Sequence, residues 1–339
     1  RWHHKHYLQE FDTPATLMDG QMSKYYTPQR SRNLYRPGCD KPFRVSRSKI
    51  DLFNKCPRCF YIDRRLGTGQ PPGYPFAINS AVDNLLKKEF DRHRDAGTQH
   101  PLQSTGGLDV GAGRPPPIDQ RRAILKGVEA SPDAPPPLPP APRSFGGGPP
   151  GGRPPPLSIP PPCGLCGGGG PARHPQIDEW RENFKGVQAS HEATNLIITG
   201  AIDDLWVDGD DRYYVVDYKA TAKSEPVTVL DKDWQDGYKR QMEVYQWLLR
   251  RNNMDVSDTG YFVYCTGRSK AKSFEGRIDF DIRLIPYEAD DSWVEPAIQS
   301  IYDCMNATEI PASGSDCDYC AYVAAVRGHS VNSQKTLFQ

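Results

Sequence analysis

The sequence has 339 residues, which is enough chain for one large domain or two ordinary ones. Lysine plus arginine and aspartate plus glutamate each number 42, so no overall charge favours nucleic acids, membranes or acidic partners. No apolar run approaches the roughly 20 residues that cross a bilayer and no secretory signal opens the sequence, so we expect a cytoplasmic protein without membrane contact.

Residues 1–45 are predicted to form a basic N-terminal arm that is partly disordered. Between Lys24 and Lys49, aromatic residues are interleaved with lysines and arginines, and Asp40 is the only acidic residue. Such a mixture suits a nucleic-acid backbone with stacked bases. A solvated basic arm without a ligand explains the composition equally well.

Residues 46–105 are predicted to be an N-terminal helical part of the main domain, which carries the first cysteine pair. Apolar residues at helical spacing precede the sequence CPRC, and a second helix is expected from Ile78 to His93. Residues 106–173 are dominated by proline and glycine and are predicted to be a disordered low-complexity insertion, because they bury too little apolar surface to offset the ordering entropy. A recent insertion or translation of GC-rich DNA in the wrong frame would give the same composition.

Residues 174–312 are predicted to form the core, and residues 313–339 carry a second cysteine pair and a tail. The expected elements are a helix at 176–188, strands at 195–207 and 212–220, a helix at 237–251, strands at 260–267 and 276–287, and a helix at 292–305. Strands followed by helices around a central hairpin indicate an α/β fold with a central mixed β-sheet flanked by helices.

The central hairpin places an acid in each of its apolar arms, although aspartate disfavours strands. Pairing the arms about the turn DGDD sets Asp203 opposite Asp217 or one residue away. Lys219 shares a strand face with Asp217 because side chains alternate along a strand. Two carboxylates and a lysine at one place suit a divalent ion and phosphodiester hydrolysis. An exposed cross-strand ion pair at the end of a strand is the alternative interpretation.

Two Cys-x-x-Cys units lie at opposite ends of the expected folded region. They are Cys56 with Cys59 and Cys317 with Cys320. Nine cysteines in a chain expected to be cytoplasmic favour thiolate metal ligation over disulfides. Four thiolates in two pairs suit tetrahedral Zn²⁺ or an iron–sulfur cluster.

The sequences GAID, VVDYK and QMEVYQWLL, in this order, resemble the PD-(D/E)XK nuclease superfamily. More narrowly, they resemble its RecB-like branch, which includes CRISPR-associated exonucleases. The resemblance covers residues 46–322 apart from the Pro/Gly segment. It implies a restriction-endonuclease-like core, Mg²⁺ or Mn²⁺ on Asp203 and Asp217, a catalytic Lys219, and support from Gln241 and Tyr245.

Two departures from this family pattern accompany the resemblance. Where many RecB-like members carry a histidine ligand on the upstream helix, this sequence has Asn79, and Asp83 one turn later is a substitute ligand. Iron–sulfur members hold a [4Fe–4S] cluster with one cysteine before the core and three after it. Here Val326 replaces the last cysteine, so the set becomes two plus two and Zn²⁺ is the alternative metal.

The sequence therefore predicts a metal-dependent DNA nuclease, acting as an exonuclease or on single strands. The alternative is a catalytically weak or inactive DNA-binding module of the same fold. DNA is the expected partner, and protein partners in DNA repair or CRISPR adaptation follow only from the resemblance.

Overall fold

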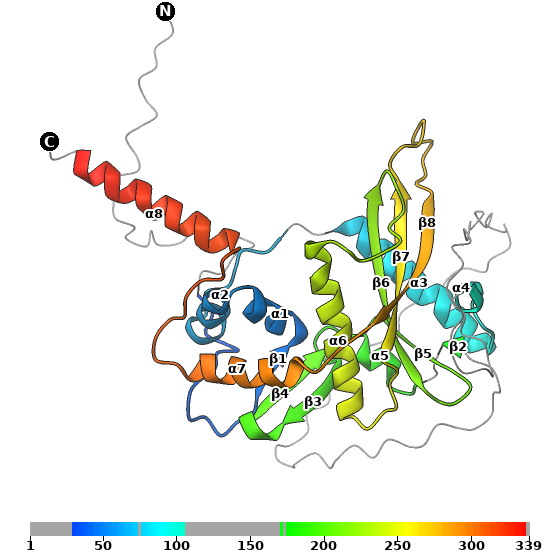
Figure 1. Ribbon diagram of the computed structural model, residues 1–339, viewed down its shortest axis with the longest axis horizontal. Coiled ribbons are helices and arrows are strands. Elements are labelled where there is room, and N and C mark those ends of the chain that lie inside the picture. The colour runs from blue at the N-terminus through cyan, green and yellow to red at the C-terminus, as the bar shows by residue number, and fades with distance from the viewer. Residues whose placement is uncertain (1–28, 74–75, 106–169, 172–173, 337–339) are drawn as a thin grey trace, which may run out of the picture. The chain divides into compact units, whose positions relative to one another are not determined.

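The computed structural model describes residues 29–73, 76–105, 170–171 and 174–336 (Figure 1). The predictions for residues 1–28, and those for the Pro/Gly segment apart from residues 170–171, lie outside the described residues. Contacts divide the chain into two compact units, one within 1–76, 188–199 and 292–339 and the other within 77–187 and 200–291. No helix among the described residues combines the length and apolar character needed to cross a membrane.

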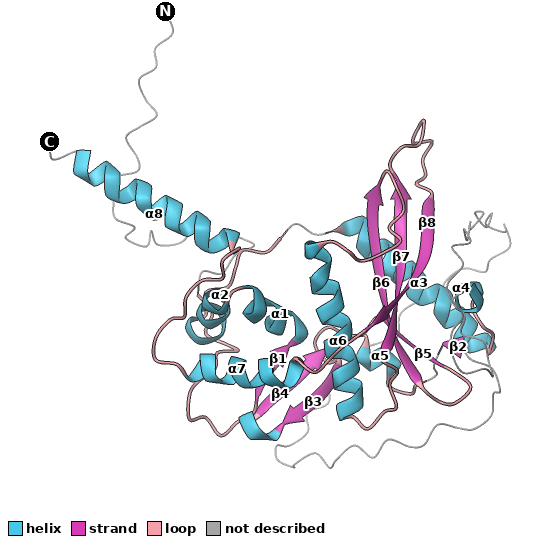
Figure 2. Cartoon of the chain, in the orientation of Figure 1, coloured by secondary structure: helices cyan, strands magenta, loops and turns pink. Residues whose placement is uncertain are grey.

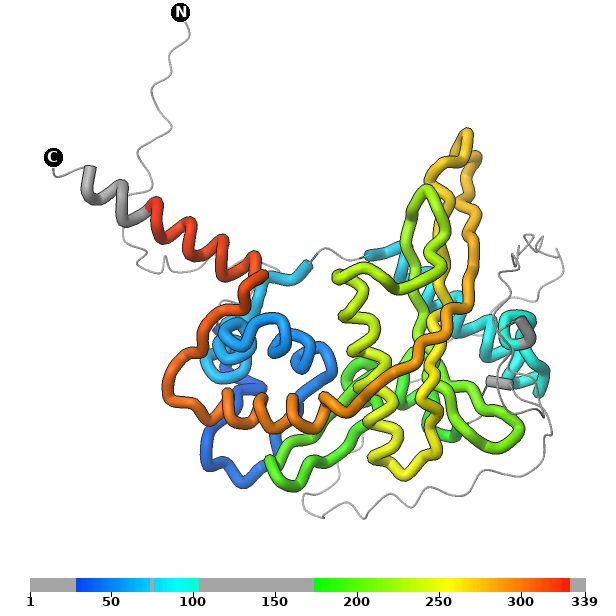
Figure 3. Tube along the Cα trace, in the orientation of Figure 1, coloured from blue at the N-terminus to red at the C-terminus, as the bar shows by residue number. Residues whose placement is uncertain are grey.

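The first unit is built around a three-stranded sheet of order β1-β4-β3, in which β1 and β4 are parallel. Helices α1 and α2 contact α7, although more than 200 residues separate them in the sequence (Figure 3). Its elements are β1 (Phe43–Ser46), α1 (Arg47–Lys55), α2 (Pro57–Tyr61), η1 (Ile62–Leu66), β3 (Val187–His191), η2 (Glu192–Thr194), β4 (Leu196–Gly200), α7 (Val294–Asn306) and α8 (Asp318–Thr336).

The second unit is built around a five-stranded mixed sheet of order β2-β5-β6-β7-β8, with helices on both sides of it (Figure 2). Strands β6 and β7 are parallel, and the pairs β2–β5, β5–β6 and β7–β8 are antiparallel. Its elements are α3 (Ala77–Ala96), α4 (Pro101–Thr105), β2 (Gly170–Pro171), α5 (Ile177–Trp180), β5 (Asp204–Val207), β6 (Tyr213–Lys223), η3 (Asp233–Gln235), α6 (Asp236–Arg251), β7 (Thr259–Arg268) and β8 (Phe280–Glu288). The mixed α/β class predicted from the sequence is confirmed, with two sheets instead of one.

The alternation of side chains along β6 separates a hydrophobic core from a polar site. Val216 and Tyr218 belong to the buried cluster that Phe90 of α3 joins. Asp217 and Lys219 project from the opposite face. There they contact residues of α6. The core therefore fixes strand β6 through one set of residues and leaves the other set for chemistry.

The predicted strand at 195–207 is wrong, because the chain forms two strands that belong to different sheets. β4 ends at Gly200 and β5 begins at Asp204. Between them, Ile202 donates its N–H to the carbonyl of Trp180 at 3.1 Å, and the Arg181 Nε donates to the carbonyl of Asp203 at 2.9 Å. Between the two strands, the backbone of residues 201–203 is thus hydrogen-bonded to Trp180 and Arg181 at the end of α5 and not to a neighbouring strand. The unbroken apolar pattern of the sequence could not reveal this break.

The basic arm and the tail contain more regular structure than the sequence predicted. Phe43–Ser46 forms β1, so the end of the expected arm is part of a sheet. Arg30 and Lys49 form ion pairs with the buried Asp63, and those two cations therefore have a structural contact. The expected tail contains α8.

Candidate functional site

The candidate site lies where strand β5 stops covering one edge of β6. β5 pairs with β6 only from Tyr213 to Val216. Beyond Val216 the same edge of β6 meets side chains in place of a strand. Asp203, the residue just before β5, accepts a hydrogen bond at Oδ2 from the backbone N–H of Tyr218 at 3.0 Å. Continuing the register by one residue would set Asp203 opposite Asp217, as the hairpin predicted.

Asp217 is completely buried and is held by two of the predicted site residues. Its carboxylate forms an ion pair with Lys219 Nζ. Gln241 Nε2 donates to Asp217 Oδ1 at 2.8 Å and lies 3.0 Å from the hydroxyl of Tyr245. The spacing of four residues places Gln241 and Tyr245 on one face of α6. Strand β6 and helix α6 therefore bring four predicted residues into one connected group.

Helix α6 approaches the start of the site closely because residue 200 is glycine. A Cβ atom at Gly200 would lie 2.7 Å from Cε1 of Tyr245 and 3.0 Å from a methyl group of Leu248. Real side chains do not approach this closely, so any other residue would force the helix away. Gly200 is the first residue of the sequence GAID, which ends at Asp203. The close approach of Tyr245 and Leu248 explains why glycine is required at this position.

Helix α3 supplies the other side of the site, and it contributes a residue that the sequence analysis missed. Lys87 Nζ donates to Asp83 Oδ2 at 2.9 Å and to Asp203 Oδ1 at 3.1 Å. Asn79, one turn before Asp83, is exposed and donates its Nδ2 to the carbonyl of Ala220 at 2.8 Å. Asn79, Asp83 and Lys87 are four residues apart on a predicted helix, so they share one face of it. This spacing could have indicated that Lys87 lies near the two predicted ligands.

The charges around Asp203 and Asp83 shift their pKa values in opposite directions. Burial favours a raised pKa for Asp203, but the ammonium groups of Lys219 and Lys87 outweigh it and hold the pKa below its usual value. Burial and the negative charge of Asp203 together raise the pKa of Asp83, against the influence of Lys87. Asp203 is therefore the carboxylate that the site keeps ionised.

The neighbouring Asp204 has a structural role, which the sequence could not separate from that of Asp203. Its side chain is fully buried and pairs with Arg94 and Arg181. It also accepts a hydrogen bond from the hydroxyl of Tyr218 at 2.6 Å. Because every oxygen of Asp204 is engaged inside the unit, this carboxylate fixes the start of β5 and thereby the position of Asp203.

The donor atoms of this site fit a hard divalent ion. Asp203 and Asp217 offer carboxylate oxygens, which are the ligands that Mg²⁺ and Mn²⁺ prefer. Both carboxylates are matched by lysine ammonium groups, from Lys87 and Lys219 respectively. On the α3 side, Asp83 is linked to Asp203 through Lys87, and Asn79 contacts strand β6 at the carbonyl of Ala220.

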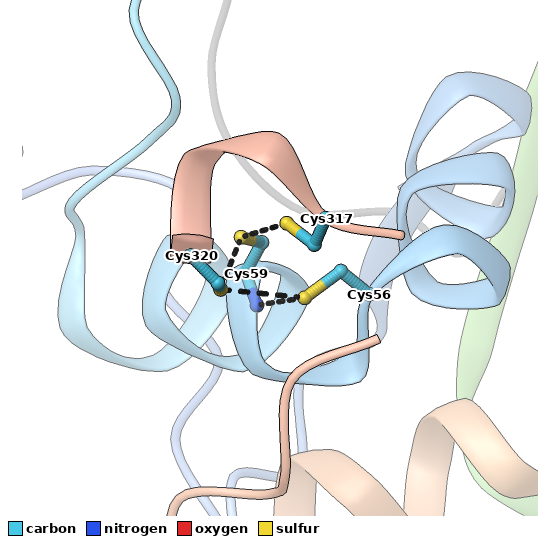
Figure 4. Close-up of side chains that lie close together, drawn as sticks. All are labelled: Cys56, Cys59, Cys317 and Cys320. Atoms are coloured by element: carbon cyan, nitrogen blue, oxygen red, sulfur yellow. Dashed lines mark hydrogen bonds between the residues drawn. The ribbon is translucent and has the colours of Figure 1, made fainter. Parts of the chain in front are cut away.

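The four paired cysteines form a second cluster, in the first unit (Figure 4). Cys59 Sγ lies 3.6 Å from Cys317 Sγ and 3.6 Å from Cys320 Sγ, and Cys56 Sγ lies 3.7 Å from Cys320 Sγ. All four sulfur atoms lie within 4.8 Å of one another. This four-cysteine cluster fits a metal clasp between two segments that are distant in the sequence.

Backbone geometry around the four-cysteine cluster favours a thiolate at Cys56. The N–H groups of Cys59 and Gly314 donate to Cys56 Sγ at 3.4 and 3.3 Å. Burial opposes ionisation, yet these hydrogen bonds lower the pKa of Cys56 to about 7. Burial raises the pKa of Cys320 to about 11. A Cβ at Gly314 would lie 2.0 Å from the carbonyl oxygen of Lys55, so only glycine lets this loop approach Cys56.

Comparison with known proteins gives a partial family match. Residues 171–325 match the family model described as the PD-(D/E)XK nuclease superfamily. A search of curated proteins found no significant match. The solved crystal structure of SSO0001 is 17% identical, with a match covering 33% of this chain and 43% of that chain, and its TM-score of 0.20 is too low to support an argument about fold. The matched region therefore spans less than half of that chain.

Proposed function

We propose that this chain is a metal-dependent nuclease that hydrolyses DNA phosphodiester bonds. The observation that carries the proposal is the connected group of Asp217, Lys219, Gln241 and Tyr245. Asp203 is held at the open edge of β6 by the N–H of Tyr218. The match of residues 171–325 to the PD-(D/E)XK superfamily model supports nuclease activity in general.

Each residue of the site has a task in this proposal. Asp203 and Asp217 hold Mg²⁺ or Mn²⁺, which supplies Lewis acidity toward the phosphate and toward an attacking water. Lys219 orients that water or stabilises the negative charge that develops on the phosphate oxygens. Gln241 fixes the rotamer of Asp217, and Tyr245 lies beside the amide of Gln241. Asn79 is a further ligand candidate on α3, whereas Asp83, which the sequence offered as a substitute ligand, accepts a hydrogen bond from Lys87.

We assign the chain to the RecB-like branch, and through it to cleavage from DNA ends or of single strands. The order of the motifs and the presence of cysteine pairs on both sides of the core support this assignment. Roles in DNA repair or CRISPR adaptation belong to the same proposal and rest on the resemblance alone.

A catalytically weak DNA-binding module is the second candidate function. Asn79 favours it, because its amide nitrogen is committed to the carbonyl of Ala220 and an amide is a weaker metal ligand than imidazole. In this case the fold and the DNA-binding surface remain while the divalent metal binds poorly.

For the four-cysteine cluster, where the sequence and its resemblance favoured a [4Fe–4S] cluster with Zn²⁺ as the alternative, we propose the alternative, a single tetrahedral Zn²⁺. Zn–S bonds of about 2.3 Å in a tetrahedron place the sulfur atoms about 3.8 Å apart. The closest Sγ separations of 3.6 and 3.7 Å agree with this value. A cubane cluster would bind each cysteine to a different iron and hold the four sulfurs farther apart.

The test of the nuclease is degradation of end-labelled single- and double-stranded DNA with Mg²⁺ or Mn²⁺. Wild type is compared with Asp217→Asn and with Asp210→Asn, an exposed turn residue of the same hairpin. Metal-dependent cleavage that persists in Asp210→Asn and disappears in Asp217→Asn supports the proposal. Equal cleavage by all three proteins, or cleavage by none, contradicts it, and the second result favours the binding module.

A further inference from the structure

We infer that the ammonium group of Lys87 serves as the counter-ion of Asp203 when no metal is bound at the candidate site. A divalent ion that binds Asp203 displaces this ammonium group, which then remains paired with Asp83. This inference rests on the proposed function, because it concerns the same carboxylates. It adds a residue that neither the motifs nor the family match assigns.

The contacts of Lys87 define this role. Its Nζ lies 3.1 Å from Asp203 Oδ1 and 2.9 Å from Asp83 Oδ2, and its side chain is only 20% exposed. The remaining oxygen of Asp203 accepts the N–H of Tyr218. Both oxygens of Asp203 are therefore engaged by donors, and the ammonium group of Lys87 competes with a metal ion at Oδ1, because it occupies one lone pair of that oxygen and repels a second cation.

The side chain of Lys87 has both the freedom and the partner needed to withdraw. Lysine carries its charge on a flexible four-carbon stem, so a small change of rotamer moves the ammonium group away from Asp203. Asp83 lies one helical turn before Lys87 on α3 and already accepts a hydrogen bond from it. The ion pair with Asp83 therefore persists when the contact with Asp203 is lost.

The arrangement places a lysine ammonium group beside each of the two carboxylates. Asp203 is balanced by Lys87 from α3, whereas Asp217 is balanced by Lys219 from β6. Without such cations, neighbouring carboxylates repel, and one of them tends to take up a proton. The two lysines are not equivalent, because Lys87 forms hydrogen bonds with two carboxylates, those of Asp83 and Asp203, whereas Lys219 forms its ion pair with Asp217 and acts on Asp203 through its charge.

The inference predicts effects of opposite sign for the two members of the α3 pair. Lys87→Met removes the competitor, so Mn²⁺ binds about three- to tenfold more tightly, the size expected for one partly buried ion pair. Asp83→Asn removes the retaining acceptor, so Lys87 holds Asp203 more firmly and Mn²⁺ binds more weakly. In the double variant, Asp83→Asn has no further effect, because the lysine through which it acts is gone.

The experiment is an Mn²⁺ titration of the full chain, followed by calorimetry or by the paramagnetic resonance of free Mn²⁺. It uses wild type, Lys87→Met, Lys87→Gln, Asp83→Asn, the double variant Lys87→Met with Asp83→Asn, and Lys88→Met as the exposed neighbouring control. Circular dichroism confirms that each variant is folded, and the glutamine variant replaces the methionine variant if the latter does not fold. Tighter binding in the Lys87 variants and wild-type affinity in Lys88→Met support the inference, as does binding that appears only when Lys87 is removed.

Unchanged or weaker binding in both Lys87 variants overturns the inference, and so does the absence of binding in every protein. A loss of affinity from Asp83→Asn that persists in the double variant also overturns it, since Asp83 would then be a direct ligand. The proposed nuclease is judged separately by DNA cleavage in wild type and Asp217→Asn. A failure of the counter-ion role is thus distinguishable from a failure of the function.

Discussion

Gln241 donates a hydrogen bond to the buried carboxylate of Asp217 at 2.8 Å, and this contact joins helix α6 to strand β6 at the candidate site. A carboxylate that is to bind a metal needs a fixed orientation, which neighbouring hydrogen bonds provide. We therefore propose that Gln241 acts through Asp217 and not on the substrate.

Replacing Gln241 by leucine should lower cleavage about 10- to 100-fold, the usual cost of losing a partner that orients a metal ligand. The half-saturating Mn²⁺ concentration should rise at the same time, which a purely structural defect would not cause. Steady-state cleavage measured across a Mn²⁺ series checks this. An unchanged metal requirement would show that Gln241 does not orient Asp217.

Lys219→Ala should remove most of the cleavage and leave DNA binding largely intact. Lys219 pairs with Asp217 and lies 4.8 Å from the centroid of the Tyr238 ring, so its ammonium group is held at the site. Removing one group that stabilises developing charge typically costs about 10²- to 10³-fold in rate. Binding is measured by fluorescence anisotropy, with Lys185→Ala, an exposed lysine of the same unit, as the control. Cleavage at the wild-type rate would contradict the assigned role.

The sequence predicted the long helices and the strands β6 and β7 of the second unit well, because their apolar patterns are long and regular. The helix expected at 176–188 is wrong, since α5 ends at Trp180 and β3 begins at Val187. Helix α6 was expected at residues 237–251 and runs from Asp236 to Arg251. The turn of the hairpin was also placed correctly, since Asp208 accepts the N–H groups of Asp210 and Arg212 as a turn aspartate should.

The interruption before Asp203 could not be predicted, and the sequence offered only helical spacing as a signal for Lys87, because both features depend on partners distant in the sequence. The hairpin pairing and the sequence GAID singled out Asp203, but nothing in the local sequence shows that its neighbour Asp204 is buried between Arg94 and Arg181. Lys87 lies 116 residues from Asp203, and only the packing of α3 against β6 brings them together.

Acid should destabilise the first unit through Asp63. This carboxylate is 1% exposed, and although burial favours a higher pKa, Lys49, Arg30 and Arg64 lower the pKa below its ordinary value. A lowered folded-state pKa gives stability that is complete above the unfolded value near 4 and is lost as the pH falls through the lower folded value.

The Asp63→Asn variant should therefore be less stable at neutral pH by about 3 kcal/mol, because it leaves three partly buried cations without the carboxylate that pairs with them. Below pH 4 the difference from wild type should shrink. Urea unfolding between pH 2.5 and 7 checks both statements, with Asp51→Asn, which pairs with Lys55 on the surface of α1, as the control. A constant difference across this range would exclude Asp63 as the source of acid sensitivity.

The purified protein should contain one Zn²⁺ per chain and lack the visible absorption of an iron–sulfur cluster. Chelation should then lower the stability of the first unit, because the four-cysteine cluster connects α2 with the start of α8. Elemental analysis and absorption spectra, followed by thermal unfolding with and without chelator, check this. Cys59→Ser should lose the metal, whereas Cys265→Ser, in the core of the second unit, should retain it. Iron in near-fourfold excess over chain, with labile sulfide, would contradict the proposal of zinc.

Trp234 should contribute to binding of single-stranded DNA near the candidate site. Its ring is 52% exposed, and Lys223 Nζ lies 4.8 Å from the ring centroid. Lys223 shares a face of β6 with Lys219 and Asp217, since an even number of residues separates their positions along the strand. A half-exposed indole beside a lysine offers a base a stacking surface and a phosphate a cation.

Trp234→Ala should weaken binding of single-stranded DNA by about 1–3 kcal/mol, the contribution of one stacked base. Trp234→Phe should recover most of this loss, because an aromatic face remains. Phe184→Ala serves as the control, since Phe184 is an exposed aromatic residue in the loop after α5. Anisotropy titrations at two salt concentrations separate stacking from charge, because loss of a stacking contact leaves the salt dependence unchanged whereas loss of a phosphate contact reduces it. If Trp234→Ala binds single-stranded DNA as tightly as wild type, the DNA does not stack on this residue and the prediction is wrong.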